Sequence, residues 1–101
     1  MRKPRIEMPM EKIEAFCRKW KVKEFSLVGS VLRDDFRPDS DVDVLVDLEQ
    51  DAPWDLFDWV DMIDELKGML GREVDLIDKT AVRNPFRRRH LLRTHEVIYA
   101  A

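Results

Sequence analysis

Two aspartates separated by one residue are the first feature of this sequence that could do chemistry. Asp41 and Asp43 stand at the start of an apolar run that continues to Val46. Because side chains alternate between the two faces of a strand, both carboxylates would lie on one face while the valines face a core. Neighbouring like charges repel and lose hydration on burial, so stability alone does not favour the pair. A hard cation such as magnesium, which binds oxygen ligands, would favour it.

A third aspartate, Asp75, lies in the downstream segment EVDLI. If Val74 and Leu76 face the core, Asp75 points to the same side as Asp41 and Asp43. Carboxylates from two neighbouring strands can hold a pair of divalent ions, which stabilise the attacking and leaving oxygens of a phosphoryl or nucleotidyl transfer. We therefore predict that these three aspartates are metal ligands and catalytic residues.

A phosphate-binding turn is predicted at Gly29 and Ser30, which follow a short apolar run. A glycine between a strand and a short helix lets a phosphate approach the backbone, where free N–H groups favour an anion. The Ser30 hydroxyl could add one hydrogen bond. Arg33, one turn later, could meet a phosphate or pair with a nearby acid. Gly-Ser alone is a weak signal, and the Gly-Lys-Ser/Thr ending of a Walker P-loop is absent.

Taken together, these residues resemble the signature of the DNA polymerase beta-like nucleotidyltransferases, and most closely that of the minimal nucleotidyltransferase (MNT) domains. That signature is G-S-x-x-R-G followed by S-D-x-D, and it stands here as GSVLRD at residues 29–34 and SDVD at residues 40–43. Asp75 matches the third family acid. The resemblance covers most of the chain. Asp34 departs from it, because the family usually has glycine there, and an acid beside a triphosphate would weaken nucleotide binding.

The resemblance implies that Gly29, Ser30 and Arg33 bind ATP or another nucleoside triphosphate. It implies that Asp41 and Asp43 bind Mg²⁺, or Mn²⁺, and that Asp75 completes the metal site or acts as a base on the incoming hydroxyl. The reaction would transfer a nucleoside monophosphate, with AMP from ATP as the expected case, and release pyrophosphate.

The resemblance also implies a partner, because MNT domains commonly act as antitoxins beside a HEPN-domain RNase toxin and can adenylylate it. An alternative is a non-catalytic antitoxin that keeps the fold and masks its toxin by binding. The intact acids favour the enzyme, whereas Asp34 favours the binder. Transfer to a small molecule such as an aminoglycoside is disfavoured, because 101 residues leave no room for a substrate domain.

Length and charge restrict the remaining possibilities. The 101 residues fit one domain, 1–101, with a loose arm at residues 1–9. The net charge is −3, but thirteen acids and one base lie between Asp34 and Glu65, and five arginines and no acid lie between Arg83 and Arg93. The acidic centre argues against nucleic-acid binding by the whole surface. The arginines are expected to form a solvated helix face.

No apolar run approaches the roughly 18 residues that span a bilayer, and the N-terminus lacks the apolar core of a signal peptide, so a cytoplasmic protein without membrane association is expected. The single cysteine, Cys17, is expected to pack as a small hydrophobe. His90 and His95 are five residues apart, off the spacing of a helical metal pair, and are expected at the surface or at a helix cap.

Alternating helical and strand patterns predict an α/β (α+β) fold, in which a small mixed β-sheet is flanked by helices. The resemblance implies the same fold. The expected helices are Met10–Trp20, Val31–Asp35, Pro53–Leu70 and Pro85–Arg93. The expected strands are Lys23–Val28, Asp41–Leu48, Glu73–Ile77 and Glu96–Tyr99. A loop is expected at Phe36–Ser40. Three residues should mark helix ends: Asp51 as the N-cap of the long helix, Gly71 at its C-terminus and Asn84 as the cap of the last helix.

The long helix carries a wider apolar arc than one sheet can cover. At about 100° per residue, one band combines Leu56, Val60, Ile63 and Leu70, and a second combines Trp59, Met62, Leu66 and Met69. We predict that Trp59 and Met62, at the edge of this arc, are partly exposed and pack against a second protein, either a HEPN partner or another copy of the chain. The alternative is that the first or the last helix of the same chain covers the extra width.

Overall fold

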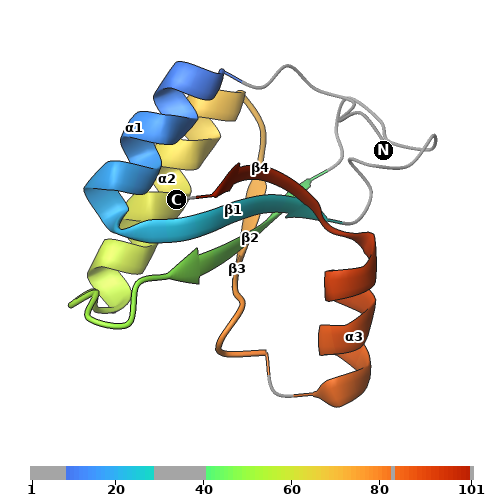
Figure 1. Cartoon of the computed structure of the whole chain (residues 1–101). Helices are drawn as coiled ribbons and strands as arrows, with labels where there is room; N and C mark the ends of the chain where they lie inside the picture. Colours follow the sequence, from blue (N-terminus) through green and yellow to red (C-terminus); the bar gives the residue numbers. More distant parts are fainter. Residues whose placement is uncertain (1–8, 29–40, 83, 101) are drawn as a thin grey trace.

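The computed structural model describes residues 9–28, 41–82 and 84–100. The expected helix Val31–Asp35, the loop Phe36–Ser40 and the phosphate-binding candidates Gly29, Ser30 and Arg33 lie outside these residues. Within them the chain forms the elements α1 (Met10–Trp20), β1 (Val22–Val28), β2 (Val42–Leu48), α2 (Leu56–Leu70), β3 (Val74–Asp78), α3 (Pro85–Thr94) and β4 (Glu96–Ala100). Figure 1 shows their arrangement.

The four strands form one mixed sheet in the order β3-β2-β1-β4. β2 and β3 run parallel, whereas β1 pairs antiparallel with both β2 and β4. The helix α2 connects the two parallel strands, as such a crossover requires. The predicted α+β fold with a small mixed sheet is confirmed.

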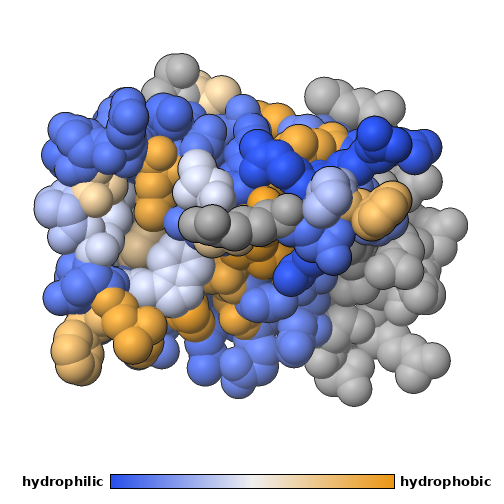
Figure 2. Space-filling view, turned by 90° about the horizontal axis from the view of Figure 1, so that it is seen from below, coloured by the Kyte–Doolittle hydropathy of each residue, from blue (hydrophilic) through white to orange (hydrophobic). Residues whose placement is uncertain are grey.

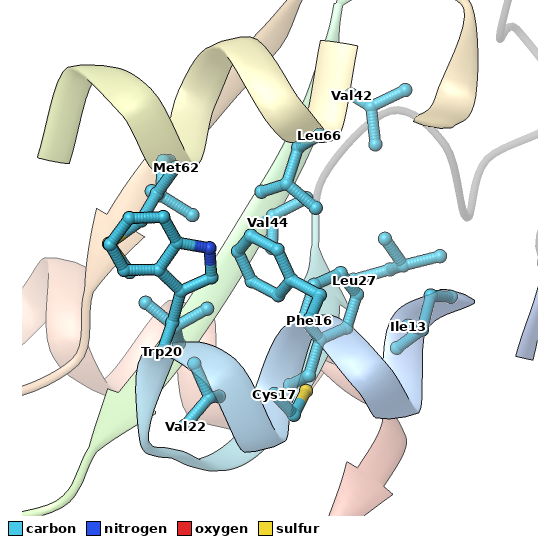
Figure 3. Packing of buried hydrophobic residues seen from close by; sticks show 13 residues of the cluster. Ile13, Phe16, Cys17, Trp20, Val22, Leu27, Val42, Val44, Met62 and Leu66 are labelled. Atoms are coloured by element: carbon cyan, nitrogen blue, oxygen red, sulfur yellow. The ribbon is translucent and has the colours of Figure 1, made fainter. Parts of the chain in front are cut away.

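The core lies between the sheet and the two helices α1 and α2 (Figure 3). The alternation in β2 buries Val42, Val44 and Val46 beneath these helices. Cys17 is buried in the same core, as expected. Burial raises the pKa of its thiol from an ordinary 9.0 to about 12, and the nearby Glu14 carboxylate adds to the rise.

The opposite face of the sheet carries α3. Leu45, which is 2% exposed, points away from the valines of β2. It borders the same small space as Arg88, Leu91 and Leu92 of α3. The sheet is therefore covered by helices on both faces, but the second face is covered only in part.

The long helix begins later than expected. It starts at Leu56, and its N-cap is Asp55 rather than Asp51. Asp55 and Asp58 form a capping box, in which the Asp58 N–H donates to Asp55 at 2.9 Å and the Asp55 N–H donates to Asp58 at 3.1 Å. The preceding residue, Trp54, stacks edge-on against Trp20 at 5.0 Å and donates its indole N–H to the Trp20 carbonyl at 2.6 Å. This tertiary contact holds Trp54 outside the helix.

The orientation of α2 also differs from the prediction. Met62 and Leu66 are 0% exposed and form the centre of its buried face, whereas Leu56 and Val60 are 74% and 47% exposed. Contacts with α1 explain this orientation of α2. The Lys19 ammonium group and the Trp20 indole N–H both contact the Glu65 carboxylate at 3.0 Å.

These contacts turn the Glu65 side of α2 toward α1 and bring Met62 over the core. The expectation that Met62 is partly exposed is therefore wrong, while Trp59 is half-buried as expected. The alternative prediction was that the first or the last helix covers part of the apolar arc. It is correct for the Glu65 side of α2, which α1 contacts.

Candidate active site

The sheet brings two of the three predicted acids together. Asp43 lies within β2 and stands opposite Asp75 of β3 in the parallel register. Their neighbours Val44 and Leu76 are buried on the first face, so both aspartates belong to the second face. Asp43 is half-buried and Asp75 is exposed. Two carboxylates from separate segments of the chain thus meet where sequence reasoning expected them.

The third acid, Asp41, directly precedes β2 and is exposed. Its backbone neighbour Val42 begins the ladder to β3 with an N–H bond to the Glu73 carbonyl at 2.9 Å. Asp41 therefore lies at the end of the sheet where β2 and β3 begin. Whether it joins Asp43 and Asp75 in one site stays a prediction.

The antiparallel pairing of β1 with β2 brings the end of β1 next to the acid pair. Val28, the last residue of β1, stands opposite Asp43. The sequence continues from Val28 into Gly29 and Ser30, which lie outside the described residues. β1 therefore ends beside Asp43. The order of positions across the sheet is Val28, Asp43 and Asp75.

Carboxylate oxygens are the donors that a hard divalent cation prefers, so Asp43 and Asp75 fit such an ion. Over residues 9–28, 41–82 and 84–100, however, no group of three or more histidines, cysteines, aspartates and glutamates is arranged to hold a metal. The three-carboxylate metal site remains a sequence-based prediction. The structure itself shows two neighbouring acids, Asp43 and Asp75, on the second face of the sheet.

A cleft of about 520 Å³ opens along β3. Asp75, Leu76, Ile77 and Asp78 of β3 form one wall, and Trp59 of α2 and Arg87 of α3 contribute to the others. Its remaining lining residues come from the β3–α3 connection and the α3 N-cap: Ala81, Val82 and Asn84. The volume lies in the range of ligand sites. Sequence reasoning missed this cleft, because its walls come from segments that are far apart in the chain.

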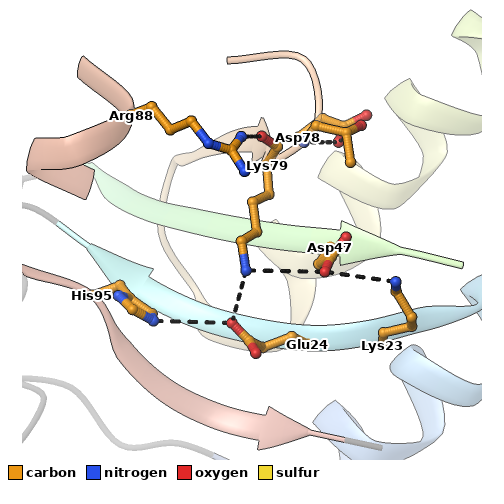
Figure 4. Close-up of polar contacts among 8 residues, drawn as sticks. Lys23, Glu24, Asp47, Asp78, Lys79, Arg88 and His95 are labelled. Atoms are coloured by element: carbon orange, nitrogen blue, oxygen red, sulfur yellow. Dashed lines mark hydrogen bonds and ion pairs between the residues drawn. The ribbon is translucent and has the colours of Figure 1, made fainter. Parts of the chain in front are cut away.

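Figure 4 shows a second polar group, which lies toward the other end of β2, around Asp47, four positions after Asp43. Lys79 contacts Glu24 at 3.7 Å and Asp47 at 4.0 Å, and His95 contacts Glu24 at 3.9 Å. Arg88 donates to the Lys79 carbonyl at 2.7 Å. These contacts tie the end of β3 and both ends of α3 to β1 and β2. They hold the cleft wall in place.

The histidines and arginines near the C-terminus behave largely as expected. His95 is the C-cap residue of α3, and its Nδ1 lies 2.6 Å from the Leu92 carbonyl oxygen. Asn84 caps the start of α3, accepting bonds from the N–H groups of Phe86 and Arg87. Most arginines of α3 are exposed, while Arg88 is half-buried. None of the described helices is long and apolar enough to cross a membrane.

Comparison with known proteins adds independent information. Residues 9–99 match the family model described as a nucleotidyltransferase domain. The chain is 33% identical over 78 residues to protein adenylyltransferase MntA of Thermococcus cleftensis, covering 77% of this chain and 74% of that protein. It is 34% identical over 68 residues to a Methanocaldococcus jannaschii protein provisionally named a protein adenylyltransferase, covering 67% of this chain and 68% of the other.

Solved structures share the fold at lower sequence identity. A toxin–antitoxin crystal structure with AMP-PNP superposes with a TM-score of 0.74 at 19% identity, covering 93% of this chain and 75% of that one. A complex of a tri-AMPylated Shewanella oneidensis HEPN toxin with an MNT antitoxin gives a TM-score of 0.66 at 19% identity, covering 91% and 70%. At these identities the likeness establishes the architecture.

Proposed function

Because this chain belongs to the nucleotidyltransferase-domain family, in its minimal branch, we propose that it transfers AMP from ATP to a hydroxyl group of a HEPN-domain toxin. In this role it acts as the antitoxin of the pair. The observation that carries the proposal is the register that sets Asp43 opposite Asp75 on an open face, beside the end of β1.

The reaction is a displacement at phosphorus. The acceptor hydroxyl oxygen bonds to the α-phosphorus of ATP, and the bond from that phosphorus to the bridging oxygen breaks. Pyrophosphate leaves with the electron pair. Asp75, the exposed acid of the pair, takes the hydroxyl proton, because its carboxylate stands at the edge of the sheet from which an acceptor can approach.

Asp41 and Asp43 would hold a divalent cation, Mg²⁺ or Mn²⁺, by their carboxylate oxygens. When bound, such an ion supplies charge stabilisation for the phosphate oxygens. Gly29 and Ser30 would hold the triphosphate, and Arg33 would add a positive charge to it. These three assignments rest on the sequence pattern that follows β1.

The nature of the acceptor is supported by the relatives. Proteins that share about a third of their residues with this chain over two thirds of its length carry protein adenylyltransferase names. A structural neighbour is an antitoxin bound to an AMPylated HEPN toxin. A second candidate function, a non-catalytic antitoxin, is favoured by one observation, the acid Asp34 at the position where the family has glycine.

The two functions are separated by one experiment. The protein is purified with the product of its neighbouring gene and incubated with ATP labelled at the α-phosphate and with Mg²⁺. Label should appear on the toxin chain and disappear in the Asp43→Asn variant. If the unlabelled toxin is neutralised equally well by wild type and Asp43→Asn, the non-catalytic function is correct instead.

A further inference from the structure

No strand pairs with the outer side of β3 among residues 9–28, 41–82 and 84–100. β3 is the terminal strand of the sheet among the described residues. Its backbone bonds to β2 involve the Glu73 carbonyl and the Lys79 N–H, each at 2.9 Å. Backbone groups alternate in direction along a strand, so the odd-numbered residues of β3 face β2. The N–H and C=O groups of Val74 and Leu76 therefore point outward, where an added strand could pair with them.

An apolar stripe on α2 lies on the same side of the molecule. We define it as Leu56 and Val60, which are 74% and 47% exposed and lie one helical turn apart. At about 100° per residue, Leu56 lies opposite Glu65, which contacts α1. The stripe therefore faces away from α1, toward the β3 side of the sheet. Exposed apolar side chains interrupt the hydrophilic surface in the view of Figure 2.

Exposed apolar side chains of this size in one helical turn mark an interaction surface. Trp59, between Leu56 and Val60 in sequence, lines the cleft along β3. The stripe, the cleft and the outer edge of β3 are thus parts of one continuous surface. A partner that pairs with β3 would contact all three.

The charges around this surface select the partner. Asp55 and Asp64 are exposed beside the stripe on α2, and Asp75 and Asp78 line the cleft with one base, Arg87, while Lys67 is paired with Glu73 at 3.0 Å. In a symmetric pair of copies joined at their β3 edges, the two α2 helices would lie on the same face and their acids would oppose each other. Like charges in an interface disfavour a second copy. A basic polypeptide has the complementary charge.

The outer edge of β3 lies next to Asp75, so a segment bound there would be close to the acid pair. The positions across the second face run from Val28 through Asp43 to Asp75, and β3 is the last strand on that side. A side chain on a strand added to β3 would lie about 5 Å from its neighbour on the same face. A hydroxyl at the position beside Asp75 would therefore lie next to that carboxylate, on the side away from β1.

We propose that the acceptor protein docks an extended, basic segment on the outer edge of β3, as an added strand. Main-chain bonds to Val74 and Leu76 hold the segment, and the apolar stripe Leu56 and Val60 packs against it. The cleft receives one of its side chains, and the hydroxyl to be modified lies beside Asp75. Strand addition of this kind combines backbone affinity with selection of alternate side chains. The inference rests on the proposed adenylylation of a protein acceptor.

The test uses the Leu56→Asp/Val60→Asp double variant, with Val97→Asp as its matched control. Val97 is 42% exposed and lies on β4, at the opposite edge of the sheet. Transfer of labelled AMP to the HEPN-domain protein of the neighbouring gene is measured, together with ATP affinity by calorimetry. We expect the double variant to lose at least about tenfold in kcat/KM through a raised KM for the acceptor, as loss of an apolar contact surface predicts. ATP affinity and the Val97→Asp protein should be unchanged.

A second measurement follows the edge directly. Amide hydrogen exchange is recorded by NMR for the wild-type protein alone and with the acceptor. The Val74 and Leu76 amides should exchange more slowly in the complex, while β4 amides stay as they were. If the double variant modifies the acceptor with the wild-type KM and these amides are not protected, the docking inference is overturned and the proposed function stands. If wild type transfers no label and binds no acceptor, the proposed function itself fails and the docking inference with it.

Discussion

Asp43 and Asp75 stand opposite each other in the parallel pairing of β2 and β3. They are separated by the whole of α2 in sequence, yet they occupy neighbouring positions on one face of the sheet. Like charges directly opposite each other on neighbouring strands are destabilising. We propose that a bound cation offsets this repulsion between Asp43 and Asp75.

Removal of one charge should separate activity from stability. We expect Asp43→Asn and Asp75→Asn each to lower AMP transfer by at least about 100-fold, because each removes a carboxylate from the reacting centre. In metal-free buffer Asp75→Asn should be as stable as wild type, or more stable by a few tenths of a kcal/mol, because like-charge repulsion is relieved. Labelled-ATP transfer and urea unfolding measure the two effects.

Asp47→Asn is the matched control, because Asp47 lies on the same strand and the same face. It contacts Lys23 at 3.8 Å and Lys79 at 4.0 Å, so its charge is compensated. Its replacement should preserve transfer and lower stability by up to about 1 kcal/mol. Equal loss of transfer in Asp47→Asn and Asp43→Asn would show that the acid pair has no special role.

The capping box of α2 gives a prediction about stability. Asp55→Ala should reduce the free energy of unfolding by about 1 kcal/mol, because it removes the side-chain acceptor for the Asp58 N–H. Asp51→Ala should change it by less than about 0.5 kcal/mol, since Asp51 makes only a surface ion pair with Lys21 at 3.6 Å. Chemical unfolding of both variants decides which aspartate is the N-cap. A larger cost for Asp51→Ala would place the helix start where the sequence pattern first indicated.

The rotation of α2 is tested by a pair of truncations. Met62→Ala should cost about 2–5 kcal/mol, because it removes a fully buried side chain and leaves a cavity. Val60→Ala should lie within about 0.5 kcal/mol of wild type, because Val60 is a surface residue. The same reasoning predicts that Met62→Asp unfolds the protein and Val60→Asp does not. Comparable losses for the two alanine variants would contradict the observed helix orientation.

Cys17 predicts how stability depends on alkaline pH. The pKa of the thiol in the folded protein is about 12, above its ordinary value of 9.0. The stabilisation that comes from keeping the thiol protonated in the folded state is therefore fully present below pH 9. As the pH rises from 9 toward 12, the thiol ionises in the unfolded chain but not in the folded one, and this group lowers the unfolding free energy by about 1.4 kcal/mol per pH unit. Urea unfolding of wild type and Cys17→Ala at pH 8, 10 and 11 isolates the effect.

At pH 8 the wild type should be the more stable protein by about 1 kcal/mol, because alanine leaves a small cavity. This advantage should shrink and then reverse by pH 11, while lysines and tyrosine affect both proteins alike. Parallel losses of stability in the two proteins would mean that the thiol ionises equally well in the folded state.

Several local features were predictable from the sequence, because they depend on near neighbours in the chain. The helix Met10–Trp20 has the predicted bounds. Gly71 ends α2 with a φ of 67°, a left-handed conformation that glycine adopts without strain. Asn84 followed by Pro85 starts α3 as predicted. The alternation around Asp43 and Asp75 likewise predicted the face on which the acids lie, since side-chain direction in a strand has a fixed period of two.

The tertiary structure alone decided which part of the wide apolar arc of α2 would be buried. Periodicity defines an arc but not which part of it faces the sheet, and contacts of Lys19 and Trp20 with Glu65 fixed that choice. Trp54 moved the start of α2 by packing on Trp20, a contact across 34 positions of the chain. The cleft along β3 arises in the same way, because α2, β3 and α3 must be packed before Trp59, Asp75 and Arg87 can border one space. The sequence by itself determined the elements and their chemical residues, whereas long-range packing decided the helix rotation and the shape of the site.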